Sequence, residues 1–215
     1  MLALIVMLNW LTSAQEASAR CANPGAAQTE AATGPDRMTV MLRISSADDA
    51  SKNSHLCNGH YELKVSRPGG GEPQTGDLLT SNDDYGRELS GRLSGVSKDG
   101  KHVLGILRES GKHGIMFAFD YQLSDGAVQL IDLKEKIAGM ANGNCSEAAV
   151  FGTTVTGGIV VEVRARTKAG KPCAANGRWM VDGSGRKAQR VAPGAAVVRL
   201  YGRQARRRII SRSKP

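Results

Sequence analysis

The chain has 215 residues, a formal net charge of +9 and only 4% aromatic residues. This length suits one domain with short appendages, and the composition excludes a core built mainly from aromatic side chains. The last seventeen residues hold seven positive charges and no acid, so the basic character belongs chiefly to a tail, residues 199–215.

The N-terminus has the pattern of a secretory signal peptide. Residues 2–11 are nearly all apolar, and Ala17-Ser18-Ala19 supplies an A-x-A cleavage pattern. Because a bilayer-spanning helix needs roughly 20 apolar residues, this run is too short to be one. We expect cleavage of residues 1–19, a mature start at Arg20, no transmembrane segment in the mature chain, and a secreted or periplasmic protein. The alternative is that the apolar run forms the first strand or helix of the fold.

Residues 20–37 mix Ala, Gly, Pro and Thr without apolar periodicity, which predicts a flexible lead-in. From Met38 to Ser45, apolar residues recur with a period of two, which indicates a half-buried strand. A second strand is predicted over residues 60–65. It is followed by a long Pro- and Gly-rich turn over residues 67–76.

The remaining strands come in two sets separated by turn signals. Asp125-Gly126 between apolar runs is a strong hairpin signal. The predicted strands are residues 102–108, 115–121 and 127–133 in the first set, and 149–155, 159–166, 178–182 and 187–191 in the second. No segment keeps a helical period, so we expect a mainly β protein of antiparallel hairpins and meanders. We place it in one β-rich domain over residues 38–198.

The stretch Val96-Ser97-Lys98-Asp99-Gly100-Lys101-His102-Val103 resembles the S-x-D-G-K turn and following strand of TolB-type β-propeller repeats. The resemblance covers residues 87–134 and, more loosely, residues 148–191, which suggests two blade-like repeats. It implies a binding or scaffolding role in an exported bacterial protein, and it supplies no catalytic residues to transfer. Closed propellers need four to eight blades, so we expect blade-like sheets or a curled sandwich and not a full closed propeller.

The chain contains four cysteines, which pair readily in an oxidising compartment. None forms a C-x-x-C pair, so neither a thioredoxin-type site nor a zinc ribbon is indicated. Counting outward from the turn at residues 156–158 brings Cys145 and Cys173 to the same end of a hairpin. This predicts one disulfide between Cys145 and Cys173 and a second between Cys21 and Cys57.

Three other groups of residues have both a functional and an ordinary interpretation. His55 and His60 flank Cys57 and could bind copper or zinc, but a loop with two solvent-exposed histidines is the simpler interpretation, so we expect no metal. Asp83, Asp84 and Glu88 could be the carboxylates of a hydrolase, but a solvated loop is the simpler interpretation. The tail arginines can bind an anionic surface: Arg203, Arg206, Arg207, Arg208 and Arg212.

No G-x-S-x-G elbow or phosphate-binding loop occurs in the chain. We therefore expect an exported, non-enzymatic protein of the bacterial cell envelope that binds or scaffolds and has no cofactor. Its partner would be an anionic envelope polymer or another protein, and not nucleic acid. The alternatives are a secreted hydrolase that uses the loop carboxylates and a periplasmic metal-handling protein.

Overall fold

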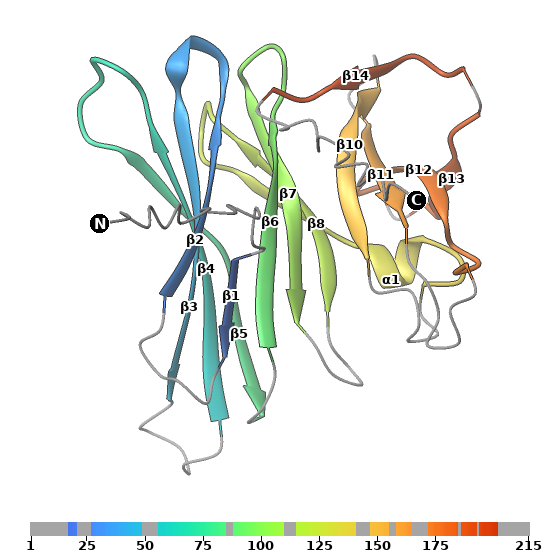
Figure 1. The fold of residues 1–215 in the computed structure, drawn as a ribbon, viewed down its shortest axis with the longest axis horizontal. Coiled ribbons are helices and arrows are strands. Elements are labelled where there is room, and N and C mark those ends of the chain that lie inside the picture. Colours follow the sequence, from blue (N-terminus) through green and yellow to red (C-terminus); the bar gives the residue numbers. More distant parts are fainter. Residues whose placement is uncertain are drawn as a thin grey trace, which may run out of the picture.

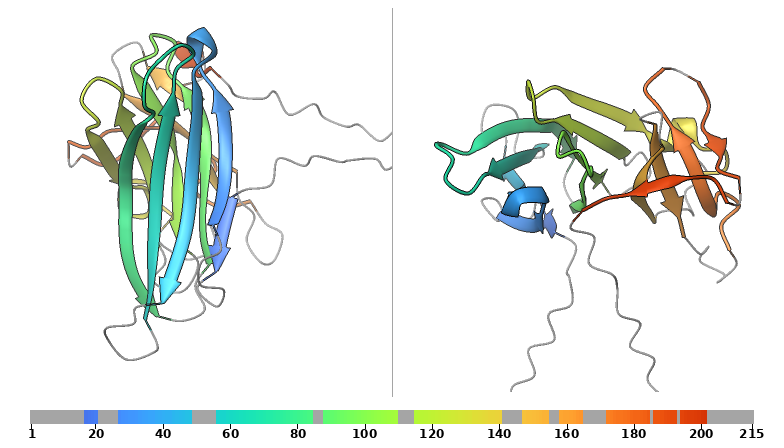
Figure 2. Two further views of the ribbon diagram at one scale, coloured as in Figure 1. Left: turned by 90° about the vertical axis from the view of Figure 1, so that its left-hand side faces the viewer. Right: turned by 90° about the horizontal axis from the view of Figure 1, so that it is seen from above.

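The computed structural model describes residues 17–20, 27–48, 56–84, 88–109, 115–140, 147–154, 158–164, 172–184, 186–192 and 194–201. These residues form three antiparallel sheets that lie side by side (Figure 1). Seen from above, the first and third sheets lie on opposite sides of the middle one (Figure 2). No helix in this part of the chain is long and apolar enough to span a membrane.

The first sheet is a meander in which each strand pairs with the next along the chain. Its strands are β2 (Ala27–Thr33), β3 (Thr39–Asp48), β4 (Leu56–Ser66) and β5 (Gln74–Asp84), with the 3-10 turn η1 (Pro35–Arg37) between β2 and β3. Alternate side chains of β3 and β4 face inward and are fully buried, whereas Arg43 and Glu62 face outward and form an ion pair.

The middle sheet has the order β1-β6-β7-β8-β9. Its strands are β1 (Ala17–Arg20), β6 (Glu88–Val96), β7 (His102–Glu109), β8 (Met116–Gln122) and β9 (Val128–Asp132). After β9 the short helix α1 (Leu133–Lys136) begins with Asp132, whose carboxylate accepts hydrogen bonds from the N–H groups of Lys134 and Glu135.

The third sheet has the order β13-β12-β11-β10-β14. Its strands are β10 (Ala148–Thr154), β11 (Ile159–Val163), β12 (Gly177–Val181), β13 (Gln189–Arg190) and β14 (Val197–Arg199). The chain therefore builds this sheet outward from β10 and then returns to pair β14 with the other edge of β10.

Both faces of the middle sheet are covered by hydrophobic cores. Along β7, Val103 and Leu107 pack against the first sheet, while Leu104 and Ile106 pack against the third. Because side chains alternate between the two faces of a strand, β7 has to be apolar at nearly every position. The strand predicted over residues 102–108 meets this requirement, because its sequence has no polar face.

The predicted fold class is confirmed: the protein is mainly β, its sheets are antiparallel meanders, and none of the three described sheets closes into a barrel. The strands predicted between residues 38 and 65 and between residues 102 and 191 are all present, with shifted ends. The expectation of a flexible lead-in over residues 20–37 is wrong for residues 27–33. These residues form β2 and pair with residues 39–45 of β3. β5 and β6 were not predicted as strands.

Gly105 in β7 offers a direct test of how tightly the middle sheet packs. A Cβ at this position would lie 2.4 Å from the Arg92 carbonyl oxygen and 2.4 Å from the Phe119 ring. We expect Gly105→Ala to lower the free energy of unfolding by about 1–3 kcal/mol, the usual effect of overpacking a core. Urea denaturation measures it. Gly71→Ala is the matched control, because nothing lies within 4 Å of its Cβ position. Equal stability of the two variants would contradict the packing described here.

Candidate functional site

The outer face of the third sheet carries a group of arginines, which we call the arginine face: Arg164, Arg178 and Arg199 with Phe151 and Glu162. On the inner face, Val161, Val163 and Trp179 are buried against the middle sheet. Their neighbours Glu162 and Arg178 lie opposite each other in the β11–β12 pair and point the other way. Sheet alternation thus separates an apolar inner side from a charged outer side.

A β-bulge places Phe151 on this face. Val150 pairs with Val161 and Gly152 pairs with Val160, so Phe151 is an extra residue in β10. The guanidinium carbon of Arg178 lies 3.7 Å from the centroid of the Phe151 ring, and that of Arg199 lies 5.7 Å away. Phe151 is only 8% exposed. Cation–π attraction therefore holds two arginines over one aromatic ring.

Glu162 is the acid at the centre of the arginine face. Arg164 donates from Nε to Oε2 at 2.9 Å and from Nη2 to Oε1 at 3.0 Å. Arg178 donates from Nε to Oε1 at 3.1 Å. A nearly buried carboxylate needs such partners, because desolvation of an unpaired charge is costly. Arg164 and Arg178 share this carboxylate, and Glu147 lies opposite Arg164, just before the neighbouring strand β10. The three arginines of the arginine face thus outnumber the two acids beside them.

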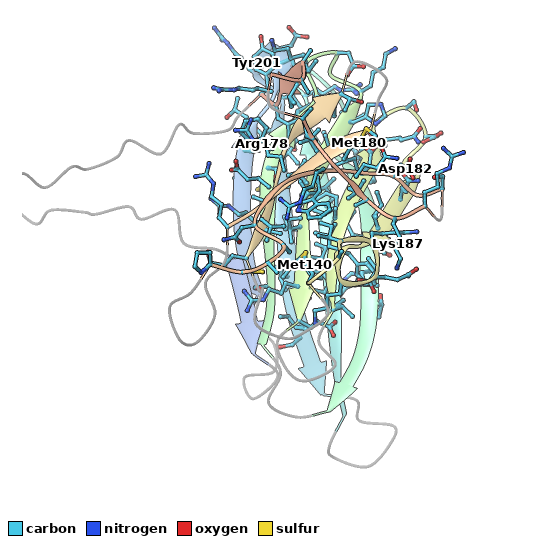
Figure 3. The ribbon with its side chains drawn as sticks, turned by 90° about the vertical axis from the view of Figure 1, so that its right-hand side faces the viewer. Met140, Arg178, Met180, Asp182, Lys187 and Tyr201 are labelled. Atoms are coloured by element: carbon cyan, nitrogen blue, oxygen red, sulfur yellow. The ribbon has the colours of Figure 1, made fainter. Side chains whose placement is uncertain are left out.

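The start of the basic tail is attached beside the arginine face. Arg199 lies opposite Gly152 in the β10–β14 pair, Leu200 is buried, and Tyr201 exchanges two backbone hydrogen bonds with Val96 of β6. Arg178 and Tyr201 are both near the upper end of this side of the molecule (Figure 3). Residues 199–201, which we expected to open the tail, thus belong to the fold. Arg203, Arg206, Arg207, Arg208 and Arg212 lie outside the described residues.

A second polar cluster lies at the turn between β6 and β7. The hydroxyl of Ser97 donates to Asp99 at 2.5 Å and accepts from the backbone N–H of His102 at 3.0 Å. The His102 ring is 2.9 Å from Asp120 of β8. The Ser97 hydroxyl therefore contacts the His102 backbone and not its ring. The sequence alone does not indicate this pair, because Asp120 comes from the next strand.

The two carboxylates of this cluster have opposite pKa shifts. Burial raises the pKa of Asp120 above its usual 3.8, with the hydrogen bond from His102 opposing that effect. The hydroxyl of Ser97 lowers the pKa of Asp99 below its usual 3.8, assisted by the backbone N–H of Lys101. The fold therefore favours the protonated form of Asp120 and the ionised form of Asp99.

These shifts predict opposite pH dependences for two variants. Stability contributed by Asp120 is lost as pH rises through its raised folded pKa, whereas stability contributed by Asp99 is lost as pH falls. As the pH rises from about 3 to about 6, the free energy of unfolding of Asp120→Asn should increase relative to that of the unmodified protein. That of Asp99→Asn should decrease over the same interval. Urea denaturation across this range measures both, and slopes of the same sign would contradict the assignment.

The other predicted site residues do not gather into a metal or catalytic centre among the described residues. Nε2 of His60 lies 3.0 Å from Asp77 Oδ1, on the outer face of the first sheet, and His55 falls outside the described residues. No group of three metal-ligating side chains occurs in the described part of the chain. The backbone of Asp83 and Asp84 ends β5, and that of Glu88 begins β6. The side chains of Asp83, Asp84 and Glu88 lie outside the part of the chain that the structure describes.

Cys173 is a buried, disulfide-bonded cysteine. The backbone N–H of Ala175 donates to its Sγ at 3.3 Å. Its predicted partner Cys145 lies outside the described residues, as does Cys21, and the described part of Cys57 is its backbone. The register supports the predicted end of the hairpin, since Ala148 and Gly177 both lie level with Val163 of β11. The pairing itself remains a prediction.

We predict that Cys145 is the partner of Cys173, because each precedes the start of a strand at the same end of the third sheet. Peptide mapping without reduction should recover the two cysteines in one linked species. Replacing both with Ser should cost roughly 3–4 kcal/mol, because the bridge closes a loop of about 28 residues. The Cys21→Ser, Cys57→Ser double variant serves as the comparison. A peptide linking Cys57 to Cys145 would overturn the pairing.

No family model, curated protein or solved structure matches this chain. The arginine face is therefore interpreted from its own geometry.

Proposed function

We propose that the protein is exported to the bacterial cell envelope and binds an anionic polymer there without catalysing a reaction. The observation that carries this proposal is the pair of guanidinium groups held over Phe151, of which Arg178 also donates to Glu162. Arginine forms bidentate hydrogen bonds with phosphate and carboxylate groups, so a fixed group of arginines favours anionic ligands.

The basic tail supports the same ligand class. Arg203 is four residues beyond Arg199, and an extended chain spans at most about 3.3–3.6 Å per residue. The tail charges therefore begin a short stretch of chain beyond the arginine face. A polymer bound at the face would meet the charges of the tail, and two linked sites on one ligand strengthen binding through effective concentration.

Export is supported by two features of the chain. The short apolar run ends before the Ala17-Ser18-Ala19 pattern, as in a secretory signal. The disulfide at Cys173 suits an oxidising compartment. Cleavage after Ala19 would leave only Arg20 of β1, which pairs at the edge of the middle sheet. The four-strand meander β6–β9 does not require β1 for its own pairing.

The proposed relationship to TolB-type repeats rests on the turn at residues 97–101 and on strand order. Each described sheet contains four strands that follow one another along the chain and pair in that order. Propeller blades share this arrangement. The relationship supports binding or scaffolding as the general role, and the charged residues favour an anionic ligand.

We predict that deleting Arg203 to Pro215 weakens retention on immobilised heparin at low salt and leaves the melting temperature unchanged. The deletion removes six of the seven positive charges of the tail and none of the described residues. Polyanion binding by clustered basic residues falls with salt through counterion release. Arg43→Gln, which removes one charge on the opposite outer face, is the control for charge alone. Unchanged retention of the deletion variant would count against the proposal, and so would an unfolded body.

A further inference from the structure

We infer that the arginine face is a pre-organised subsite that selects oxyanion groups along a linear polymer, whereas the tail supplies charge without selection. This inference rests on the proposed function and deepens it. The oxyanion is a phosphate or a carboxylate, because a guanidinium group recognises both through paired N–H donors.

Two contacts hold Arg178 in one orientation. Its guanidinium stacks on Phe151 at 3.7 Å, and its Nε donates to Glu162. A free arginine side chain has about 2 kcal/mol of rotamer entropy to lose on binding, and prior ordering removes much of that cost. Each hydrogen bond that Arg178 makes to a ligand therefore contributes more than one from a solvated arginine.

The guanidinium groups of the arginine face keep N–H donors for a ligand. Glu162 engages Nε of Arg178, and no other acceptor among the described residues is hydrogen-bonded to Arg178. The Arg178 side chain is 41% exposed and that of Arg164 is 75% exposed. Arg199 is exposed as well and has no carboxylate partner among the described residues. The outward Nη groups are thus accessible from solvent.

Arg190, a neighbouring arginine on the same sheet, has a structural role and not a ligand-binding one. Arg190 lies over the Trp179 ring at 4.5 Å and donates to the backbone oxygens of Asn176 and Ala174 at 3.0 Å each. Those bonds use both of its Nη groups to hold the loop before β12. The comparison distinguishes Arg190, whose two Nη groups are both occupied by the fold, from Arg178 and Arg199 on the arginine face.

The test uses the mature full-length protein and two synthetic polyanions of matched charge, polyphosphate and polyglutamate. Arg178→Lys keeps the charge but loses the planar donor fork, and Phe151→Leu keeps an apolar side chain but removes the ring. We expect each variant to bind at least one of the two polymers about tenfold more weakly, with the dependence on salt unchanged. Arg43→Lys, the same exchange on the first sheet, should bind like the unmodified protein.

Melting temperatures show whether each variant remains folded, and Arg199→Lys replaces Phe151→Leu in the comparison if the latter unfolds. A loss confined to one polymer identifies the oxyanion that the subsite recognises, and a loss in both assigns the shared chemistry. If Arg178→Lys and the second variant bind both polymers as tightly as the unmodified protein, the subsite is overturned. In that case, loss of heparin retention on tail deletion would still support the proposed function. A full-length protein that binds no polyanion would contradict both.

Discussion

The structure depends on burying both faces of one sheet. The strands β7 and β8 have apolar side chains pointing alternately into the core shared with the first sheet and the core shared with the third. Fully burying a Val, Leu, Ile or Phe side chain contributes about 1.5–3 kcal/mol. Few polar or bulky substitutions are therefore compatible with the middle sheet. Gly105 shows the limit, because Phe119 and the Arg92 backbone occupy the space that a side chain would need.

This constraint determines where charge can be placed. The first sheet buries one face against the middle sheet and leaves the other in water, as antiparallel sheets commonly do. The third sheet also buries one face there, but on its outer face Val160 and Phe151 are buried as well. On the third sheet the bulge at Phe151 puts an aromatic ring on the outer face, and Arg178 and Arg199 pack over it. The same alternation that buries Val161 and Trp179 thus supports the arginine face.

The sequence predicted the parts of the fold that follow a simple pattern. Period-two alternation identified β3, and apolar runs between turn signals identified β7 to β12. It could not reveal β6, because Ser90, Gly91, Ser94 and Gly95 interrupt its apolar pattern although all four are buried. β2 was missed for a related reason, since its Ala and Thr residues gain their order from backbone pairing with β3. The His102–Asp120 pair and the arginine face needed cross-strand registers and a bulge, which propensity does not supply.

The middle sheet is the shared support of both hydrophobic cores. Hydrogen exchange of the backbone amides tests this role. Amides buried in the most stable element exchange only through global unfolding, whereas those of less stable elements exchange through local opening. We predict that the paired amides of β7 are the slowest of the described chain, slower than those of β4 in the first sheet and β11 in the third. Faster exchange in β7 than in either outer sheet would contradict the account.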